Sequence, residues 1–216
     1  EMCIRDRCRG LGMAVDVFDE EGNSVTDTPG ELVCTKPFPS MPVMFWNDPD
    51  GKKYQEAYFD YYPNVWRHGD WTKLTKRGTL VIFGRSDATL NPGGVRIGTA
   101  EIYKVVESFE AILESIVIGQ EWEDDIRIVL FVKLKEKACL DEKIKVEIKN
   151  KLRQLVSPRH VPAKIISVAD IPRTRSGKIT ELAVRDIIHG KKIKNIEALS
   201  NPEALDLFKD LSELNN

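Results

Sequence analysis

The sequence has few cysteines and histidines, and long apolar runs are missing. Its 216 residues include 4 Cys and 3 His, with no Cys-x-x-Cys pair and no histidine at ligand spacing from a cysteine. We therefore expect reduced thiols, no structural metal and a cytoplasmic location. No apolar stretch approaches the roughly 20 residues of a membrane span. The first residues also lack the apolar segment of a signal peptide.

An excess of charge of either sign is missing too. The sequence carries 32 Lys+Arg and 34 Asp+Glu, a formal net charge of -2, which argues against a nucleic-acid-binding protein. What is present is the balance of a globular protein, 42% hydrophobic and 31% charged residues. A chain of this length buries roughly 70% of the surface that it exposes when unfolded, so it can fold without metals or disulfides.

The first part of the sequence has the pattern of short β-strands joined by turns and loops. We expect strands at residues 13–18, 31–35, 66–70 and 79–84, a proline-rich loop over 36–50 and a short helix over 52–62. Residues 1–9 show no periodicity and do not begin with methionine. The prediction is a β-rich subdomain over residues 1–86, with residues 1–9 as a possible non-native junction.

The second part alternates between helical and strand patterns. We expect helices at residues 99–109, 141–156 and 180–189, and strands at 116–119, 126–134 and 164–168. In the first of these helices, apolar residues recur at helical spacing and Thr99 is the expected N-cap. The strand over 126–134 alternates strictly, and we expect its second face to be partly buried. The predicted fold class is α+β, with a compact α+β domain over residues 87–216.

Three polar segments contain more glycine and charge than packing requires. They are His-Gly-Asp at 68–70, the stretch 84–96 from Gly-Arg-Ser-Asp to Asn-Pro-Gly-Gly-Val-Arg, and Pro-Arg-Thr-Arg-Ser-Gly-Lys at 172–178. In this order and spacing they resemble the C-terminal signature set of the AMP-forming acyl-CoA synthetases. Segments that look most like the acetoacetate-using members of that family lie at 30–37, 45–48, 90–96, 159–162 and 200–203. The resemblance runs from about Gly10 to the C-terminus.

The resemblance implies a reaction in two steps. A carboxylate attacks the α-phosphate of ATP to give an acyl-adenylate, and the thiol of CoA then displaces AMP; Mg²⁺ accompanies the phosphates of ATP. It also implies that residues 1–86 end the large AMP-binding N-terminal domain and that residues 87–216 form the mobile C-terminal domain. A Ser/Thr/Gly-rich phosphate loop and an acyl pocket have no counterpart here. We therefore expect an inactive fragment that needs the missing N-terminal region of the same enzyme.

The resemblance also implies roles for three residues near the predicted domain boundary. Asp70 matches the residue that accepts both ribose hydroxyls of the nucleotide, which suits an acceptor-only carboxylate. Arg85 matches an arginine near the ribose and phosphate, and Asp87 matches the hinge about which the C-terminal domain rotates. Without the family, Asp70 is a turn residue, Arg85 a surface arginine and Asp87 a cap or turn. The role of His68 is left open.

Four residues of the second part complete the predicted site. Gly93 and Gly94 are inferred from the family to keep the path of the CoA pantetheine arm open, although a tight turn also needs glycine. Arg96 resembles an arginine that meets nucleotide phosphates. Lys178 resembles the catalytic lysine, whose ammonium offsets the charge that builds as the carboxylate meets the α-phosphate. Its alternative interpretation is a solvated basic turn or an unspecific anion site.

Three hypotheses about function remain open at this point. The first is a ligase that acts on the small molecules acetoacetate, ATP and CoA. The second keeps the family and changes the acid to acetate, propionate or another short acid. The third, from another class, is a nucleotide- or CoA-binding module without turnover.

Overall fold

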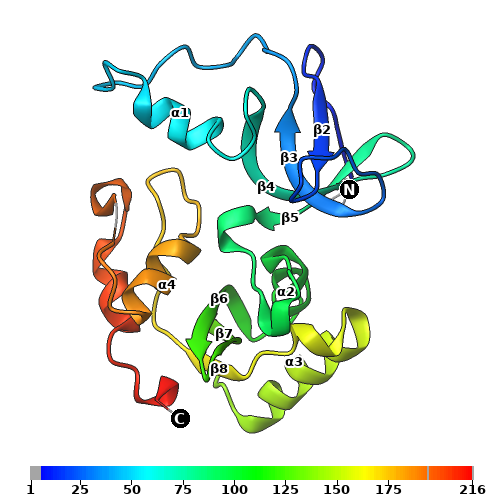
Figure 1. The fold of residues 1–216 in the computed structure, drawn as a ribbon. Coiled ribbons are helices and arrows are strands. Elements are labelled where there is room, and N and C mark those ends of the chain that lie inside the picture. Colours follow the sequence, from blue (N-terminus) through cyan, green and yellow to red (C-terminus); the bar gives the residue numbers. More distant parts are fainter. Residues whose placement is uncertain (1–5, 194, 216) are drawn as a thin grey trace. The chain divides into compact units, whose positions relative to one another are not determined.

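The computed structural model describes residues 6–193 and 195–215 (Figure 1). The backbone falls into two compact units, the first ending at Asp87 and the second beginning at Ala88. Both units combine helices and strands, and the α+β fold class predicted from the sequence is confirmed. The assignment of residues 1–86 and 87–216 to parts of an enzyme stays a prediction.

The first unit is built on an antiparallel sheet. Its described strands are β1 (Asp6–Cys8), β2 (Val15–Phe18), β3 (Pro29–Cys34), β4 (Trp66–Leu74) and β5 (Thr79–Arg85), in the spatial order β1-β5-β4-β3-β2. The later four overlap the strands expected from the alternating pattern. Strand β1 was not expected: it lies within the predicted junction over residues 1–9 and pairs with β5, while residues 1–5 lie outside the described residues.

A small apolar core and an aromatic cluster stabilise this unit. Val17, Leu32 and Leu80 pack together as a buried apolar cluster, while the Trp66 ring stacks on Tyr58 with ring centroids 3.6 Å apart. Tyr58 ends the short helix α1 (Lys52–Tyr58), which has no buried residue of its own. Burial of apolar and aromatic side chains is the main stabilising term in such a small unit.

The second unit has a sheet with β7 in the middle. Strands β6 (Ile112–Trp122) and β7 (Asp125–Leu134) form an antiparallel hairpin, and β8 (Lys164–Ser167) pairs parallel to β7. Helices α2 (Thr99–Val106), α3 (Glu142–Leu155) and α4 (Glu181–Ile188) surround this sheet. Short 3₁₀ helices precede, connect or follow them, and the first of these spans the boundary between the units: η1 (Ser86–Ala88), η2 (Pro92–Gly94), η3 (Pro158–His160), η4 (Ile196–Ala198), η5 (Pro202–Phe208) and η6 (Ser212–Leu214).

The two faces of β7 belong to two different cores. Ile128, Leu130 and Val132 face α2 and α3, whereas Val129 and Phe131 pack with α4 and the segment around η5. Figure 1 shows α2 and α3 on one side of the sheet and α4 on the other. The strand predicted to bury its second face only in part is therefore buried on both faces, because α4 and segments after residue 195 cover the second one.

Helix starts in the second unit follow ordinary capping rules with one correction. Asp141 caps α3, and its carboxylate accepts a hydrogen bond from the Ile144 amide at 2.8 Å. The prediction that Thr99 caps α2 is wrong, since Gly98 occupies the N-cap and Thr99 is the first helical residue, 4% exposed. A threonine at this position packs into the core instead of bonding the helix end.

Within residues 6–193 and 195–215, no helix combines the length and the apolar character needed to cross a lipid bilayer.

Candidate functional site

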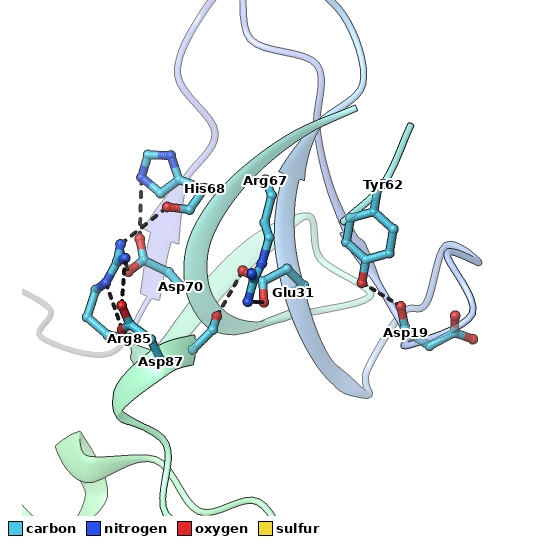
Figure 2. Close-up of polar contacts among 9 residues, drawn as sticks. Asp19, Glu31, Tyr62, Arg67, His68, Asp70, Arg85 and Asp87 are labelled. Atoms are coloured by element: carbon cyan, nitrogen blue, oxygen red, sulfur yellow. Dashed lines mark hydrogen bonds and ion pairs between the residues drawn. The ribbon is translucent and has the colours of Figure 1, made fainter. Parts of the chain in front are cut away.

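Strand pairing brings Asp70 and Arg85 together in the first unit. The two residues are register partners across β4 and β5, and the guanidinium Nη1 of Arg85 lies 3.6 Å from Oδ1 of Asp70. The same guanidinium donates to the Asp87 carboxylate, with Nε 3.4 Å from Oδ1. Figure 2 shows Arg85 between the two acidic side chains. The structure thus gathers three sequence-predicted residues into one charged cluster.

His68 is a fourth member of this cluster, and its role was left open by the sequence. Its Nε2 lies 3.3 Å from Oδ2 of Asp70, and its carbonyl accepts a hydrogen bond from Nη1 of Arg85 at 3.2 Å. Residues two apart on a strand face the same side, so the alternation of β4 was the signal that could have found it. A nitrogen of His68 thus lies near one carboxylate oxygen of Asp70, and a nitrogen of Arg85 lies near the other.

Gly69 allows Arg85 to approach the backbone of β4 this closely. Its φ is +84°, and a Cβ at this position would lie 2.7 Å from Nη2 of Arg85. Any other residue would both strain the backbone and displace the guanidinium. A hollow of about 350 Å³ lies beside the cluster, lined in part by Tyr58 and Arg67. The Arg85 side chain is 52% exposed and that of Asp70 21%, so a ligand can reach both.

A buried carboxylate fixes the chain next to Asp87. The Glu31 side chain is 5% exposed and accepts hydrogen bonds from Nη2 of Arg67 at 3.2 Å and from Oγ of Ser86 at 2.8 Å. A buried carboxylate must be paired in this way to offset its lost hydration. The sequence singled out Glu31 only as part of the segment 30–37. The signal that could have found it is a lone carboxylate inside an apolar strand.

Another polar anchor lies at the far side of the first unit. The Tyr62 hydroxyl donates to the Asp19 carbonyl at 2.7 Å. Burial raises the pKa of Tyr62 to about 12, so the hydroxyl stays protonated and remains a donor. This contact is structural and lies outside the charged cluster.

Gly93 and Gly94 form an exposed turn in the second unit. Both have positive φ, 58° and 75°, and a Cβ on either would meet no atom within 4 Å. The Gly93 amide donates to the Asp125 carboxylate, at 2.9 Å to Oδ1 and 3.1 Å to Oδ2. Backbone hydrogen bonds, from Ile126 first and from Gly93, lower the pKa of Asp125. The turn therefore needs glycine for its conformation, and open space surrounds it.

Arg96 lies in the same exposed loop. The loop is closed at its base by the antiparallel bridge between Leu90 and Ile97, and Arg96 is exposed beside this bridge. The structure therefore places the predicted phosphate-binding arginine next to the two glycines, as the sequence spacing requires.

Lys178 lies on a hairpin that we call the lysine hairpin, residues 173–179, closed by a bridge between Arg173 and Ile179. The Thr174 amide donates to the Lys178 carbonyl at 2.9 Å, and the Lys178 amide donates to Oγ1 of Thr174 at 3.1 Å. Its side chain is exposed. Among the described residues, its ammonium makes no hydrogen bond or ion pair with the protein, so the charge can meet a ligand.

The predicted site residues thus form three groups. Asp70, Arg85 and Asp87 cluster in the first unit, whereas the glycine turn with Arg96 and the lysine hairpin belong to the second. The part of the chain that the structure describes contains no group of three or more His, Cys, Asp or Glu side chains placed to hold a metal ion. The chemistry available is that of cations and backbone donors near exposed space, which suits phosphate-bearing ligands.

The match to a known family agrees with this chemistry. Residues 101–178 match the family described as AMP-binding enzyme C-terminal domain, and this range ends at the residue predicted to be catalytic. Residues 101–178 of the second unit are therefore similar to the C-terminal domain of AMP-binding enzymes.

Three proteins to which the chain is similar are named acetoacetyl-CoA synthetase. Acetoacetyl-coenzyme A synthetase of Rhizobium meliloti (strain 1021) is 65% identical over 205 residues, 95% of this chain and 32% of that protein. Acetoacetyl-CoA synthetase of Xenopus tropicalis is 47% identical over 97% of this chain and 32% of that protein. The solved structure of acetoacetyl-CoA synthetase from Streptomyces lividans has a TM-score of 0.90 at 44% identity and covers 99% of this chain and 33% of its own. The chain therefore spans about a third of the length of the relatives that it matches.

Proposed function

We propose that the chain is the C-terminal part of an acid–thiol ligase that converts acetoacetate, ATP and CoA into acetoacetyl-CoA, AMP and diphosphate. The observation that carries the proposal is a likeness sustained over both units, 65% identity across 95% of the chain to a protein named acetoacetyl-coenzyme A synthetase. The chain alone is proposed to be inactive, because acid binding and the phosphate loop are assigned to the remaining two thirds of the enzyme. A cytoplasmic location is part of the proposal and rests on the cysteine pattern.

In the first half-reaction, a carboxylate oxygen of acetoacetate attacks the α-phosphorus of ATP and diphosphate leaves. We assign Asp70 to the ribose hydroxyls, since its two oxygens can accept from a vicinal diol once they exchange their contacts with His68 and Arg85. Arg85 is assigned to the ribose and phosphate side. Lys178 is assigned to the transition state, where its ammonium stabilises negative charge that is shared by the attacking acid and the phosphate.

In the second half-reaction, the thiol of CoA attacks the acyl carbonyl and AMP leaves. We assign Gly93 and Gly94 to the path of the pantetheine arm, supported by the open space around the turn, and Arg96 to the phosphates. Asp87 is assigned to the hinge between the two conformations, supported by the division of the chain directly after it. Mg²⁺ enters with ATP, whose phosphate oxygens are the hard ligands it prefers, and no residue of this chain is assigned to it.

The test is release of diphosphate by the complete enzyme with a panel of short acids. We expect acetoacetate to give a kcat/KM at least about tenfold above acetate and propionate, since one well-placed polar contact is worth about that much or more. A preference for acetate or propionate would replace the acid and keep the ligase. ATP or CoA binding without diphosphate release from any acid would leave the binding module as the function.

A further inference from the structure

The lysine hairpin is held by the segment that follows α4, not only by its own turn. Thr174 forms an antiparallel bridge with Leu199, the Arg175 amide donates to the Ala198 carbonyl at 3.0 Å, and the Ser200 amide donates to the Arg173 carbonyl at 2.8 Å. Residues 198–200 therefore run beside the hairpin and pair with it through this isolated bridge and two backbone hydrogen bonds. These residues lie beyond the range 101–178 that matches the family.

Asn201 directly follows residues 198–200, and its side-chain amide forms hydrogen bonds at the start of the hairpin. Its Oδ1 accepts from the Arg173 amide at 2.8 Å. Its Nδ2 donates to the Asp170 carboxylate at 2.7 Å and to the Ile171 carbonyl at 3.0 Å. An asparagine side chain offers one acceptor and two donors. Here all three are used, on the first residue of the hairpin and on two residues just before it.

The Asp170 carboxylate connects this contact to the central strand of the sheet. Its Oδ1 accepts from Nζ of Lys133 on β7 at 2.6 Å. The hydrogen bond from Lys133, followed by that from Asn201, lowers the pKa of Asp170, so the carboxylate stays charged and accepts both. A continuous path of hydrogen bonds thus runs from β7 through Asp170 and Asn201 to the first residue of the hairpin.

The Arg173 side chain makes two further contacts, one with β6 and one with the opposite arm of the hairpin. The Arg173 guanidinium lies 2.7 Å from Oε1 of Glu114 on β6 and donates to the Gly177 carbonyl at 2.8 Å. Beyond these contacts the tip of the hairpin is exposed. The position of Lys178 is therefore set at the hairpin's base, where the Asn201 side chain makes three hydrogen bonds.

We propose that Asn201 is a positioning residue for the adenylation step, acting through the lysine hairpin. The inference rests on the proposed role of Lys178 and assigns a function to the Ser-Asn-Pro-Glu segment at residues 200–203, which the proposed function leaves unused. Displacement of a reacting group by about 1 Å can lower a rate roughly a hundredfold. Loss of the Asn201 amide frees the backbone at Arg173 and lets the ammonium of Lys178 sample such displacements.

The experiment compares both half-reactions in the complete enzyme for Asn201→Ala, Lys178→Ala and the double variant. Asn150→Ala is the matched control, because Asn150 is exposed on α3. Its Oδ1 accepts only a local hydrogen bond, from Nη1 of Arg153 at 3.5 Å. We expect Asn201→Ala to lower kcat for diphosphate release roughly tenfold to a hundredfold. The KM for ATP and the rate of thioester formation from supplied acyl-adenylate should stay unchanged, and the double variant should be no slower than Lys178→Ala.

Several outcomes would overturn the inference. They are equal loss in both half-reactions, a loss in the double variant that multiplies those of the single variants, or no loss at all. If Lys178→Ala itself leaves diphosphate release intact, the proposed role of the lysine fails instead. Hydrogen exchange then still decides the structural part, since Asn201→Ala should speed exchange of the Thr174 and Lys178 amides while Asn150→Ala should not.

A second variant covers the case in which Asn201→Ala does not fold. Asn201→Asp keeps the size and the acceptor for the Arg173 amide but places a carboxylate against Asp170. Two carboxylates at this distance share a proton, and one pKa is raised. Diphosphate release should therefore be lowered at neutral pH and recover relative to the unchanged enzyme as the pH falls; a parallel pH profile would contradict the inference.

Discussion

Arg85 contacts two carboxylates and a carbonyl, and these contacts define what the charged cluster can do. In the structure its guanidinium faces Asp70, Asp87 and the carbonyl of His68. A ligand that carries both hydroxyls and phosphate can replace these contacts in part, because Asp70 offers acceptors and Arg85 offers donors. We therefore propose that Asp70 and Arg85, which strand register places opposite each other, form a preformed pair for a nucleotide.

Asp70→Asn tests this pair directly. The change keeps the size of the side chain and removes one charged acceptor, so we expect the KM for ATP to rise roughly tenfold to a hundredfold in the complete enzyme, the range of hydrogen bonds to charged groups. Asp50→Asn is the control, since Asp50 lies in the exposed loop before α1. An unchanged KM for ATP in Asp70→Asn would show that the carboxylate serves the fold alone.

The elements of the fold differ in how far the sequence predicts them. Strand β7 and helix α3 were predictable, because each has a strict period and α3 also has a capping aspartate. The short strand β1 and the 3₁₀ helix η5 were not, because so few residues show no period and only tertiary contacts hold them. Strand β6 is longer than predicted since its ends pair with β7 even where its side chains are polar.

The residues of the candidate site also differ in how far a local sequence pattern predicts them. The glycine turn and the lysine hairpin were found by motif, since their residue types are needed locally. The role of His68 was left open. Glu31 and Asn201 were missed as site residues, because their partners are distant in the sequence and only the folded chain brings them together. Strand alternation could have indicated His68, but no local pattern indicates the contact between Asn201 and Arg173.

The glycine turn gives a prediction at the scale of an element. Gly94→Leu should block thioester formation and spare acid-dependent diphosphate release, if the pantetheine arm passes the turn only in the second half-reaction. The positive φ of 75° adds about 1 kcal/mol of backbone strain to any such variant, so a lowered melting temperature is expected as well. Both half-reactions are measured below the melting temperature of each variant.

Gly94→Asn separates steric blocking from strain. Asparagine tolerates positive φ better than leucine, yet it still adds a side chain to the open space around the turn. We expect it to impair the CoA step while the melting temperature stays close to that of the unchanged enzyme. Parallel loss of both half-reactions in step with the melting temperature would rule out the pantetheine path.

At the scale of the whole molecule, the division after Asp87 separates the proposed nucleotide pair from the proposed catalytic lysine. Asp70 and Arg85 belong to the first unit and Lys178 to the second. A lysine on a separate unit can serve one half-reaction and leave in the other, as a hinge at Asp87 would allow. We therefore predict that Lys178 contributes to one chemical step only.

The most direct test of this central claim is to measure both half-reactions, one at a time, in the complete enzyme and in Lys178→Ala. In Lys178→Ala, we predict that the rate of diphosphate release from ATP and acetoacetate falls about a hundredfold or more, because one preorganised charge contact is lost. Thioester formation from supplied acetoacetyl-adenylate and CoA should be retained. Equal loss in both half-reactions, or undiminished diphosphate release, would contradict this claim.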